Sequence, residues 1–328
     1  MTTSIVITSI FPPTESVVWY SKMTDYEVIV IGDNKTPKGW SCANVKYYSV
    51  DQSDSLGFEL AKKLPYNHYC RKMIGYLVAI QNDSDFIIDT DDDNAPNIRY
   101  GFPAFDSKYH CISVDKGFIN IYELYTEKKI WPRGLPLDLI GKEFKLENEL
   151  SLIDCKVGIW QGLADGDPDV DAIYRLVNND TCYFNQREPV VLGKGTISPF
   201  NTQNTIIRKD LYPLMYLPAF VTFRFTDILR SLIAQPIMWI YNYQLGFISP
   251  TVVQERNPHD YMADFISEIP MYLHTRRVIE LVSNSISKST TIECNLYNAY
   301  NCLLKDNIVC DKEMILLELW LKDIANLS

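Results

Sequence analysis

The sequence has no long apolar run and no closely spaced cysteine pair. No segment has about 18 consecutive apolar residues, so we expect no transmembrane helix. Eight cysteines are scattered over 328 residues without a CxxC pair, a distribution typical of reduced thiols rather than of a disulfide framework. The N-terminus lacks the basic region of a signal peptide. We therefore expect a cytoplasmic protein, with peripheral membrane association as the alternative.

Basic residues are also in short supply. The chain has 31 Lys and Arg against 41 Asp and Glu, which gives a net charge of -10. A nucleic-acid-binding protein needs a basic surface to neutralise phosphates, so a nucleic-acid partner is not expected. A single nucleotide is still allowed, because one metal ion and one or two basic side chains can hold it.

What the sequence does have is an apolar content of 47%, enough for a substantial core. Up to about residue 100, strand and helix patterns alternate, which predicts an α/β fold with a mostly parallel sheet and helices on both faces. The middle is irregular, and helices dominate from Thr226 onward, so we expect one compact domain with a helical C-terminal lobe. The expected strands are Ser4–Ile10, Glu27–Ile31, Val45–Val50, Phe86–Ile88, His110–Val114 and Val157–Gln161. The expected helices are Thr14–Met23, Ser55–Leu64, Tyr69–Gln81, Thr226–Tyr243, Asp260–Asn284 and Glu313–Asn326.

A dense acidic cluster follows the expected strand Phe86–Ile88. It consists of Asp89, Asp91, Asp92 and Asp93. Like charges this close repel, so the cluster needs water or a cation to neutralise it. At the end of a strand, carboxylates lie where open α/β sheets bind ligands, and oxygen ligands suit Mg²⁺ or Mn²⁺ with a phosphate as partner.

Other interpretations of this acidic cluster carry less weight. A solvated turn is the usual role of a charge run, but the apolar strand before it lowers that expectation. A calcium-binding loop would need Gly at its sixth position and Glu at its twelfth, where this chain has Asn94 and Tyr100. A phosphatase-type aspartate nucleophile has no other support in the sequence. If the segment is extended, Asp91 and Asp93 share one side and Asp92 faces the other.

An ordered series of motifs runs along most of the chain, from Ser4 to Leu273. The motifs are Thr8–Glu15, Gly32–Pro37, Leu64–Lys72, the acidic cluster, Trp131–Leu137, Pro168–Ala172, Phe200–Thr205, Phe223–Arg230 and Gln254–Asp260. In this order they resemble the STELLO family, glycosyltransferases of plant Golgi membranes. The chain is more distantly similar to the reversibly glycosylated polypeptides, or UDP-arabinopyranose mutases, which share an aspartate cluster and a later DxDA segment.

The resemblance implies a GT-A-like fold, which is a doubly wound mixed sheet flanked by helices, here with a helical C-terminal lobe. It also implies a DxD metal-binding motif. On this basis residues 1–270 form the transferase domain, with a nucleotide-binding half (1–100) and a sugar and acceptor half (101–270), and residues 271–328 form a helical extension. The implied function is metal-dependent transfer of a sugar from a nucleotide donor, expected to be UDP-linked, to a carbohydrate or lipid-linked acceptor in polysaccharide synthesis. The alternatives are a nucleotide-sugar mutase or self-glycosylating protein, and a non-catalytic scaffold. The membrane anchor of the plant proteins is not seen here, which agrees with the expected cytoplasmic location.

The implied metal ion is Mn²⁺ or Mg²⁺. We expect Asp91 and Asp93 to bind it, with Asp89 near the ribose or the metal. His259, one of only four histidines, is the candidate for a third ligand, although a lone histidine is more often structural.

The nucleotide is expected at the ends of the first two strands and on the helix before the acidic cluster. Asp33 would accept from a uracil imide N–H, or else close an Asx turn. Arg71 or Lys72 would bind the diphosphate, or else pair with the acidic cluster. The nucleotide-binding candidates are thus Thr8, Ser9, Ile10, Asp33, Arg71 and Lys72.

The remaining candidates concern the sugar and the acceptor. Arg133, in a Trp-Pro-Arg-Gly loop, could pair with phosphate or acceptor hydroxyls. Of Asp169 and Asp171, the two aspartates of the DxDA segment, we expect one to be functional and assign that role to Asp171. Asp227 is expected to be the general base for the acceptor hydroxyl, with an ordinary helix cap as the alternative. Asn201, Gln203 and Asn204 offer amides suited to a sugar, and of these we assign Asn204 to the donor.

Overall fold

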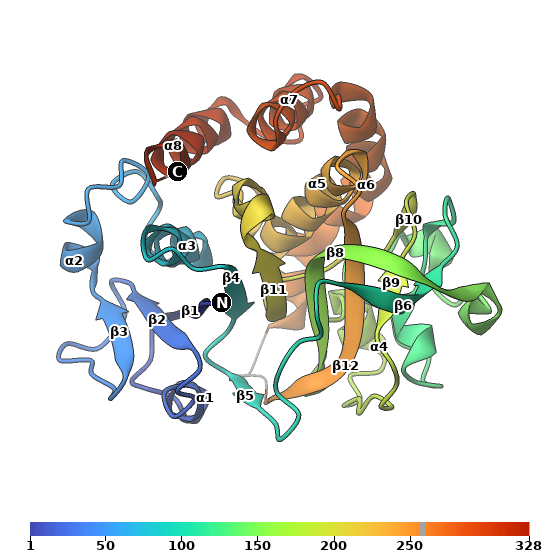
Figure 1. The fold of residues 1–328 in the computed structure, drawn as a ribbon, viewed down its shortest axis with the longest axis horizontal. Helices are drawn as coiled ribbons and strands as arrows, with labels where there is room; N and C mark the ends of the chain where they lie inside the picture. Colours follow the sequence, from blue (N-terminus) through green and yellow to red (C-terminus); the bar gives the residue numbers. More distant parts are fainter. Residues whose placement is uncertain (256–259, 328) are drawn as a thin grey trace.

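The computed structural model describes residues 1–255 and 260–327. Its centre is a ten-stranded mixed sheet in the order β3-β2-β1-β4-β11-β8-β6-β9-β12-β5, accompanied by a small sheet of β10 and β7 (Figure 1). The strands are β1 (Thr3–Ser9), β2 (Glu27–Gly32), β3 (Val45–Tyr48), β4 (Phe86–Thr90), β5 (Asn94–Pro96), β6 (Asp106–Ile112), β7 (Gly117–Phe118), β8 (Leu150–Gly166), β9 (Val190–Leu192), β10 (Thr196–Ile197), β11 (Asn204–Arg208) and β12 (Gln244–Gln254). The α-helices are α1 (Glu15–Tyr20), α2 (Val50–Asp54), α3 (Lys72–Gln81), α4 (Ala172–Val177), α5 (Thr226–Ile240), α6 (Tyr261–Ser285), α7 (Ile292–Lys305) and α8 (Asp311–Leu327). The 3₁₀ helices are η1 (Tyr69–Arg71), η2 (Ile121–Leu124), η3 (Leu137–Leu139), η4 (Leu146–Glu149), η5 (Lys209–Met215) and η6 (Phe223–Phe225).

The parallel half of the sheet is covered by helices on both faces. Strands β3, β2, β1 and β4 are parallel, and their apolar side chains alternate between two faces. Val6 packs with α3, whereas Ile5 and Ile7 pack with Val17 of α1. At Gly75 of α3 a Cβ atom would lie 2.4 Å from Val6 Cγ1, so glycine lets this helix lie directly on the strand. The alternation explains why these strands read as continuous apolar runs.

The second half of the sheet places a later segment of the chain at the carboxyl edge of the parallel strands. Strand β11 runs antiparallel to β4, and its first residue, Asn204, lies opposite Thr90. The long β8 pairs with β11, with β6 through its first part and with β12 through its second. The ends of β1, β2 and β4 therefore meet the start of β11 at one edge, the place where open α/β sheets bind ligands.

The helical C-terminal lobe joins the two halves. Helices α5 to α8 form an arc over one side of the sheet, with α8 reaching the N-terminal half (Figure 1). Asp323 of α8 accepts the backbone N–H groups of Glu59 and Leu60, at 3.1 and 2.9 Å. Glu313 of the same helix accepts those of Ala219 and Phe220, at 3.0 and 2.7 Å. The predicted fold class, a mixed α/β sheet flanked by helices with a helical C-terminal lobe, is confirmed.

Some predicted boundaries differ from the structure. The helix predicted at Ser55–Leu64 is absent, and turns occupy most of that segment. A short helix, α2, precedes it instead, because Ser49 and Gln52 form a capping box. The predicted division between residues 270 and 271 falls inside α6. None of the described helices is both long and apolar enough to cross a membrane.

Candidate active site

Two adjoining cavities open at the carboxyl edge of the parallel strands. The first has a volume of about 250 Å³ and the second about 180 Å³. Both are lined by Thr8, Tyr69, Asp92 and Phe223, so they form one continuous depression. The first cavity is further lined by Asp91, Asp93, Arg133, Asp169, Asn201, Thr202, Gln203, Arg224, Asp227 and Gln254. The second is further lined by Ser9, Ile10, Phe11, Ile31, Gly32, Asp33, Lys35, Asn67, His68 and Arg71.

The acidic cluster is neutralised from behind by buried cations. Asp89 is fully buried, and it pairs with Lys72 and Arg230, both at 2.9 Å. Lys72, also fully buried, forms a second ion pair of 2.7 Å with Asp91. Burial lowers the pKa of Lys72, but the two aspartates raise it further, so the net pKa is above its ordinary value. Of the two roles expected for Lys72, the structure shows the ion pairs with the acidic cluster. Asp89 lies beneath the site, which differs from its predicted contact with ribose or metal.

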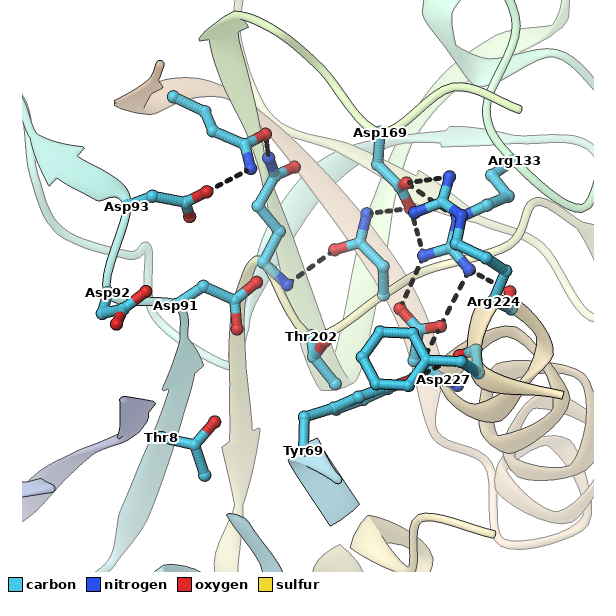
Figure 2. Close-up of a pocket in the computed structure, with 14 residues that line it drawn as sticks. Thr8, Tyr69, Asp91, Asp92, Asp93, Arg133, Asp169, Thr202, Arg224 and Asp227 are labelled. Atoms are coloured by element: carbon cyan, nitrogen blue, oxygen red, sulfur yellow. Dashed lines mark hydrogen bonds and ion pairs between the residues drawn. The ribbon is translucent and has the colours of Figure 1, made fainter. Parts of the chain in front are cut away.

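The other three aspartates all line the first cavity, on its left side in Figure 2. Burial, together with Asp93, raises the pKa of Asp91 to about 6 despite the neighbouring Lys72. Asp92 accepts a hydrogen bond from the Ser9 hydroxyl, and Asp93 accepts one of 3.1 Å from the Gln254 amide. Asp91 and Asp93 thus line the same cavity, and their binding of a metal ion stays a prediction.

A divalent ion fits this donor set only with help from a ligand. Within residues 1–255 and 260–327, no three His, Cys, Asp or Glu side chains are grouped as a metal site. Mg²⁺ commonly binds through one or two carboxylates, several waters and the phosphates of a substrate, which matches Asp91 and Asp93. The predicted third ligand, His259, lies outside the described residues.

The second cavity contains a buried arginine with unused donors. Arg71 is 1% exposed, and its Nε, Nη1 and Nη2 atoms form no hydrogen bond within the part of the chain that the structure describes. Its nearest carboxylates are Asp54 at 3.8 Å and Asp33 at 4.0 Å, and its guanidinium lies over the Tyr66 ring. A buried donor without a partner is costly, so the cavity suits a ligand with carbonyl or phosphate oxygens. The predicted residues Thr8, Ser9, Ile10 and Asp33 line the same space.

On the right side of Figure 2, one arginine holds two aspartates. Arg133 donates to both oxygens of Asp169, at 2.8 and 2.9 Å, and to both oxygens of Asp227, at 2.9 and 2.8 Å. Tyr69 donates a further hydrogen bond of 3.3 Å to Asp227. Burial raises the pKa of Asp169, but Arg133 and Arg224 outweigh it and bring the pKa below its ordinary value. Both candidates, Arg133 and Asp227, therefore face the cavity within one charged network.

Two candidates point away from the cavities. Asp171 is fully buried, where it caps α4 through the Tyr174 N–H at 2.9 Å and accepts from Trp131 Nε1 at 2.8 Å. Its neighbour Asp169 faces the cavity instead, so the structure reverses our assignment of the pair. Asn204 is fully buried and donates to Thr251 Oγ1 at 2.8 Å. It joins β11 to β12 and contacts neither cavity, because the first residue of β11 turns its side chain inward.

Several lining residues were not among the predicted set. Some of these residues lie inside the motifs that resemble the STELLO family, namely Tyr69, Phe223 and Arg224. The motifs therefore indicated the right segments, but not which side chains point into the cavity. Gln254 also begins one of the motifs, but its place at the cavity depends on the pairing of β12 with β5 and β8, which the sequence does not reveal. Asn201 and Gln203, which we expected to offer amides to a sugar, do line the cavity. The residues missed are Tyr69, Asp92, Asp169, Thr202, Phe223, Arg224 and Gln254.

Comparisons with known proteins agree with the motifs. Residues 224–328 match the family model of the STELLO glycosyltransferases. The chain is 26% identical over 331 residues to "Probable glycosyltransferase STELLO1" of Arabidopsis thaliana, covering 95% of this chain and 43% of that protein. It is 27% identical over 297 residues to "Probable glycosyltransferase STELLO2" of the same plant, covering 85% and 39%. The chain thus spans less than half the length of either protein. Among solved structures, a crystal structure of a mycobacterial protein aligns with a TM-score of 0.41 and 12% identity, covering 88% of this chain and 76% of that one. The sequence matches confirm the resemblance of this chain to the STELLO family.

Proposed function

We propose that this chain is a metal-dependent glycosyltransferase that takes a sugar from a UDP-linked donor and passes it to a carbohydrate or lipid-linked acceptor in polysaccharide synthesis. The observation that carries the proposal is the pair of adjoining cavities at the carboxyl edge of the sheet. One offers the buried guanidinium of Arg71, which forms no hydrogen bond to any described residue, and the other offers the carboxylates of Asp91 and Asp93. The similarity to proteins named as probable glycosyltransferases supports the same activity.

In this proposal the second cavity binds the base of the nucleotide. A uracil ring presents an imide N–H between two carbonyl oxygens. Asp33 can accept from the N–H, and the unused donors of Arg71 can reach a carbonyl oxygen. Thr8 lines both cavities, so it lies where the ribose would pass from one to the other.

The first cavity would receive the diphosphate and the sugar. Asp91 and Asp93 would hold Mn²⁺ or Mg²⁺, and the ion would supply positive charge for the leaving diphosphate. Arg133 keeps Asp169 and Asp227 fixed at the opposite wall. Asp227 remains the candidate for accepting the proton of the acceptor hydroxyl, and Arg133 holds the carboxylate in place by bonding to both of its oxygens.

Calorimetry with UDP and MnCl₂ tests the donor site. We expect wild-type protein to bind UDP and the ion together, and the double variant Asp91→Asn, Asp93→Asn to lose the manganese-dependent part of the affinity. Asp92→Asn is the matched control, because it neutralises a neighbouring carboxylate of the same cluster that is not assigned to the ion. Retained manganese-dependent binding in the double variant would refute the metal assignment.

A panel of UDP-sugars with manganese then separates the activities. Free UDP together with a new glycan supports transfer. A ring-isomerised UDP-sugar without net release of UDP identifies a mutase instead, and a sugar left on the protein identifies self-glycosylation. A wild-type protein that binds no UDP in the presence of metal would leave only the scaffold role.

A further inference from the structure

Two arginines line the first cavity, and they differ in how many of their guanidinium nitrogens are bonded to protein oxygens. Arg133 has its Nε, Nη1 and Nη2 atoms all bonded to protein oxygens. Arg224 has its Nε and Nη2 atoms bonded to Glu268, at 2.9 and 2.8 Å, and Nη2 also donates to Val170 O at 3.3 Å. Within the described parts of the chain, the Nη1 atom of Arg224 forms no hydrogen bond. Arg224 therefore keeps a free donor edge while it lines the cavity.

The carboxylate of Glu268 in α6 is fully buried and bonded on both oxygens. One oxygen accepts from Arg224, and the other accepts from the Ala172 N–H at 2.7 Å and from the Tyr272 hydroxyl at 2.6 Å. The preceding residue, Ser267, accepts the backbone N–H of Arg224 at 3.1 Å. Helix α6 thus fixes both the main chain and the guanidinium of Arg224.

We propose that Glu268 is a positioning residue that orients Arg224 so that its free edge binds the diphosphate of the nucleotide donor. This inference rests on the proposed function for the identity of the anion. A guanidinium is planar, so one carboxylate that holds two of its donors also fixes the direction of the opposite donor edge. Glu268 itself touches neither cavity, so its effect would pass through Arg224.

The charge of Glu268 makes the proposal falsifiable. A carboxylate beside Arg224 weakens the attraction of that arginine for an anion, so removing the charge alone would tighten the binding of UDP. Loss of orientation has the opposite effect, because a group misplaced by about 1 Å can lose up to about a hundredfold in effectiveness. The direction of the change in affinity therefore distinguishes positioning from simple electrostatics.

Calorimetric titration of UDP in the presence of MnCl₂ measures that direction. We expect Glu268→Gln and Arg224→Gln each to raise the Kd of UDP by roughly tenfold, the scale of one hydrogen bond to a charged group. The double variant should be no weaker than Arg224→Gln alone, since both changes remove the same contact. Tyr272→Phe is the control, because it removes a donor from Glu268 without touching Arg224, and it should leave the Kd unchanged. An unchanged or lower Kd in Glu268→Gln, or additive losses in the double variant, would overturn the proposal.

A measurement without ligand separates this inference from the proposed function. In ¹⁵N spectra of the free protein, the Nε–H of Arg224 should exchange slowly with solvent in the wild type and in Tyr272→Phe, and quickly in Glu268→Gln. If wild-type protein binds no UDP, the proposed function fails, and the spectra still decide whether Glu268 holds Arg224. Equal protection in all three proteins would overturn the positioning role.

Discussion

At the scale of single residues, Arg71 is the group whose environment most requires a ligand. Its guanidinium is buried, and among the described residues no acceptor forms a hydrogen bond with any of the three guanidinium nitrogens. We expect Arg71→Lys to weaken the binding of UDP by tenfold or more, because lysine keeps the charge but lacks the planar set of donors. Isothermal calorimetry gives the Kd.

The control for this substitution is Arg175→Lys. Arg175 is also buried, but it pairs with Asp167 at 3.0 Å and lines neither cavity. This variant should unfold more easily than the wild type and bind UDP with unchanged affinity. Equal losses of UDP affinity in both variants would contradict a specific role for Arg71.

Asp171 gives the protein a pH-dependent stability. Burial raises its pKa to about 6 in the folded state, against about 3.9 in an unfolded chain. Between these values the folded state binds more protons than the unfolded state, so this contribution is complete below about pH 4 and is lost as the pH rises through about 6. The loss amounts to at most about 3 kcal/mol, at about 1.4 kcal/mol per pKa unit.

Urea unfolding of wild type and Asp171→Asn from pH 4 to 7 measures this effect. Asparagine still caps the helix but does not titrate. The free energy of unfolding of the wild type should therefore fall relative to the variant as the pH rises. Parallel curves for the two proteins would show that Asp171 does not titrate in this range.

At the scale of elements, helix α8 accepts hydrogen bonds from backbone segments that are far apart in the sequence. The buried carboxylate of Glu313 accepts two backbone N–H groups and the Tyr216 hydroxyl, and burial raises its pKa. Glu313→Gln replaces one accepting oxygen with an amide that faces a donor, so we expect a loss of about 1–3 kcal/mol in the free energy of unfolding. Chemical denaturation measures it. Glu318→Gln, on the exposed side of α8, should change the value by less than about 0.5 kcal/mol.

The sequence allowed some elements to be predicted better than others. Strands β1, β2 and β4 and helices α3, α5, α6 and α8 follow from local apolar patterns and caps. Strand β8 has 17 residues, but the sequence pattern predicted only Val157–Gln161. The first part of the strand is mostly exposed and forms by pairing with β6, so it has no apolar pattern of its own. The same limit applies at the site. Asp171 was preferred to Asp169 because its capping of α4 depends on local geometry that a DxDA pattern does not contain.

At the scale of the whole molecule, binding should stabilise the fold. A ligand that binds only the folded state at a hundred times its Kd adds about 2.7 kcal/mol to the free energy of unfolding. We expect UDP with MnCl₂ to raise the Tm by a few degrees, and UDP with EDTA to raise it less. Differential scanning fluorimetry records the shift. Equal shifts with and without manganese would contradict metal-dependent binding.

The buried Lys72 also bears on when a metal ion can enter the protein. Because this lysine already compensates Asp89 and Asp91, the chain can fold before any divalent ion is available. Under the proposed assignment of the ion to Asp91 and Asp93, one of these two carboxylates is already paired. We therefore expect the free protein to have little affinity for the ion alone, and the phosphates of a bound nucleotide to complete the coordination. The fraction of protein carrying metal in a cell would then follow the supply of the nucleotide-sugar rather than the supply of the metal.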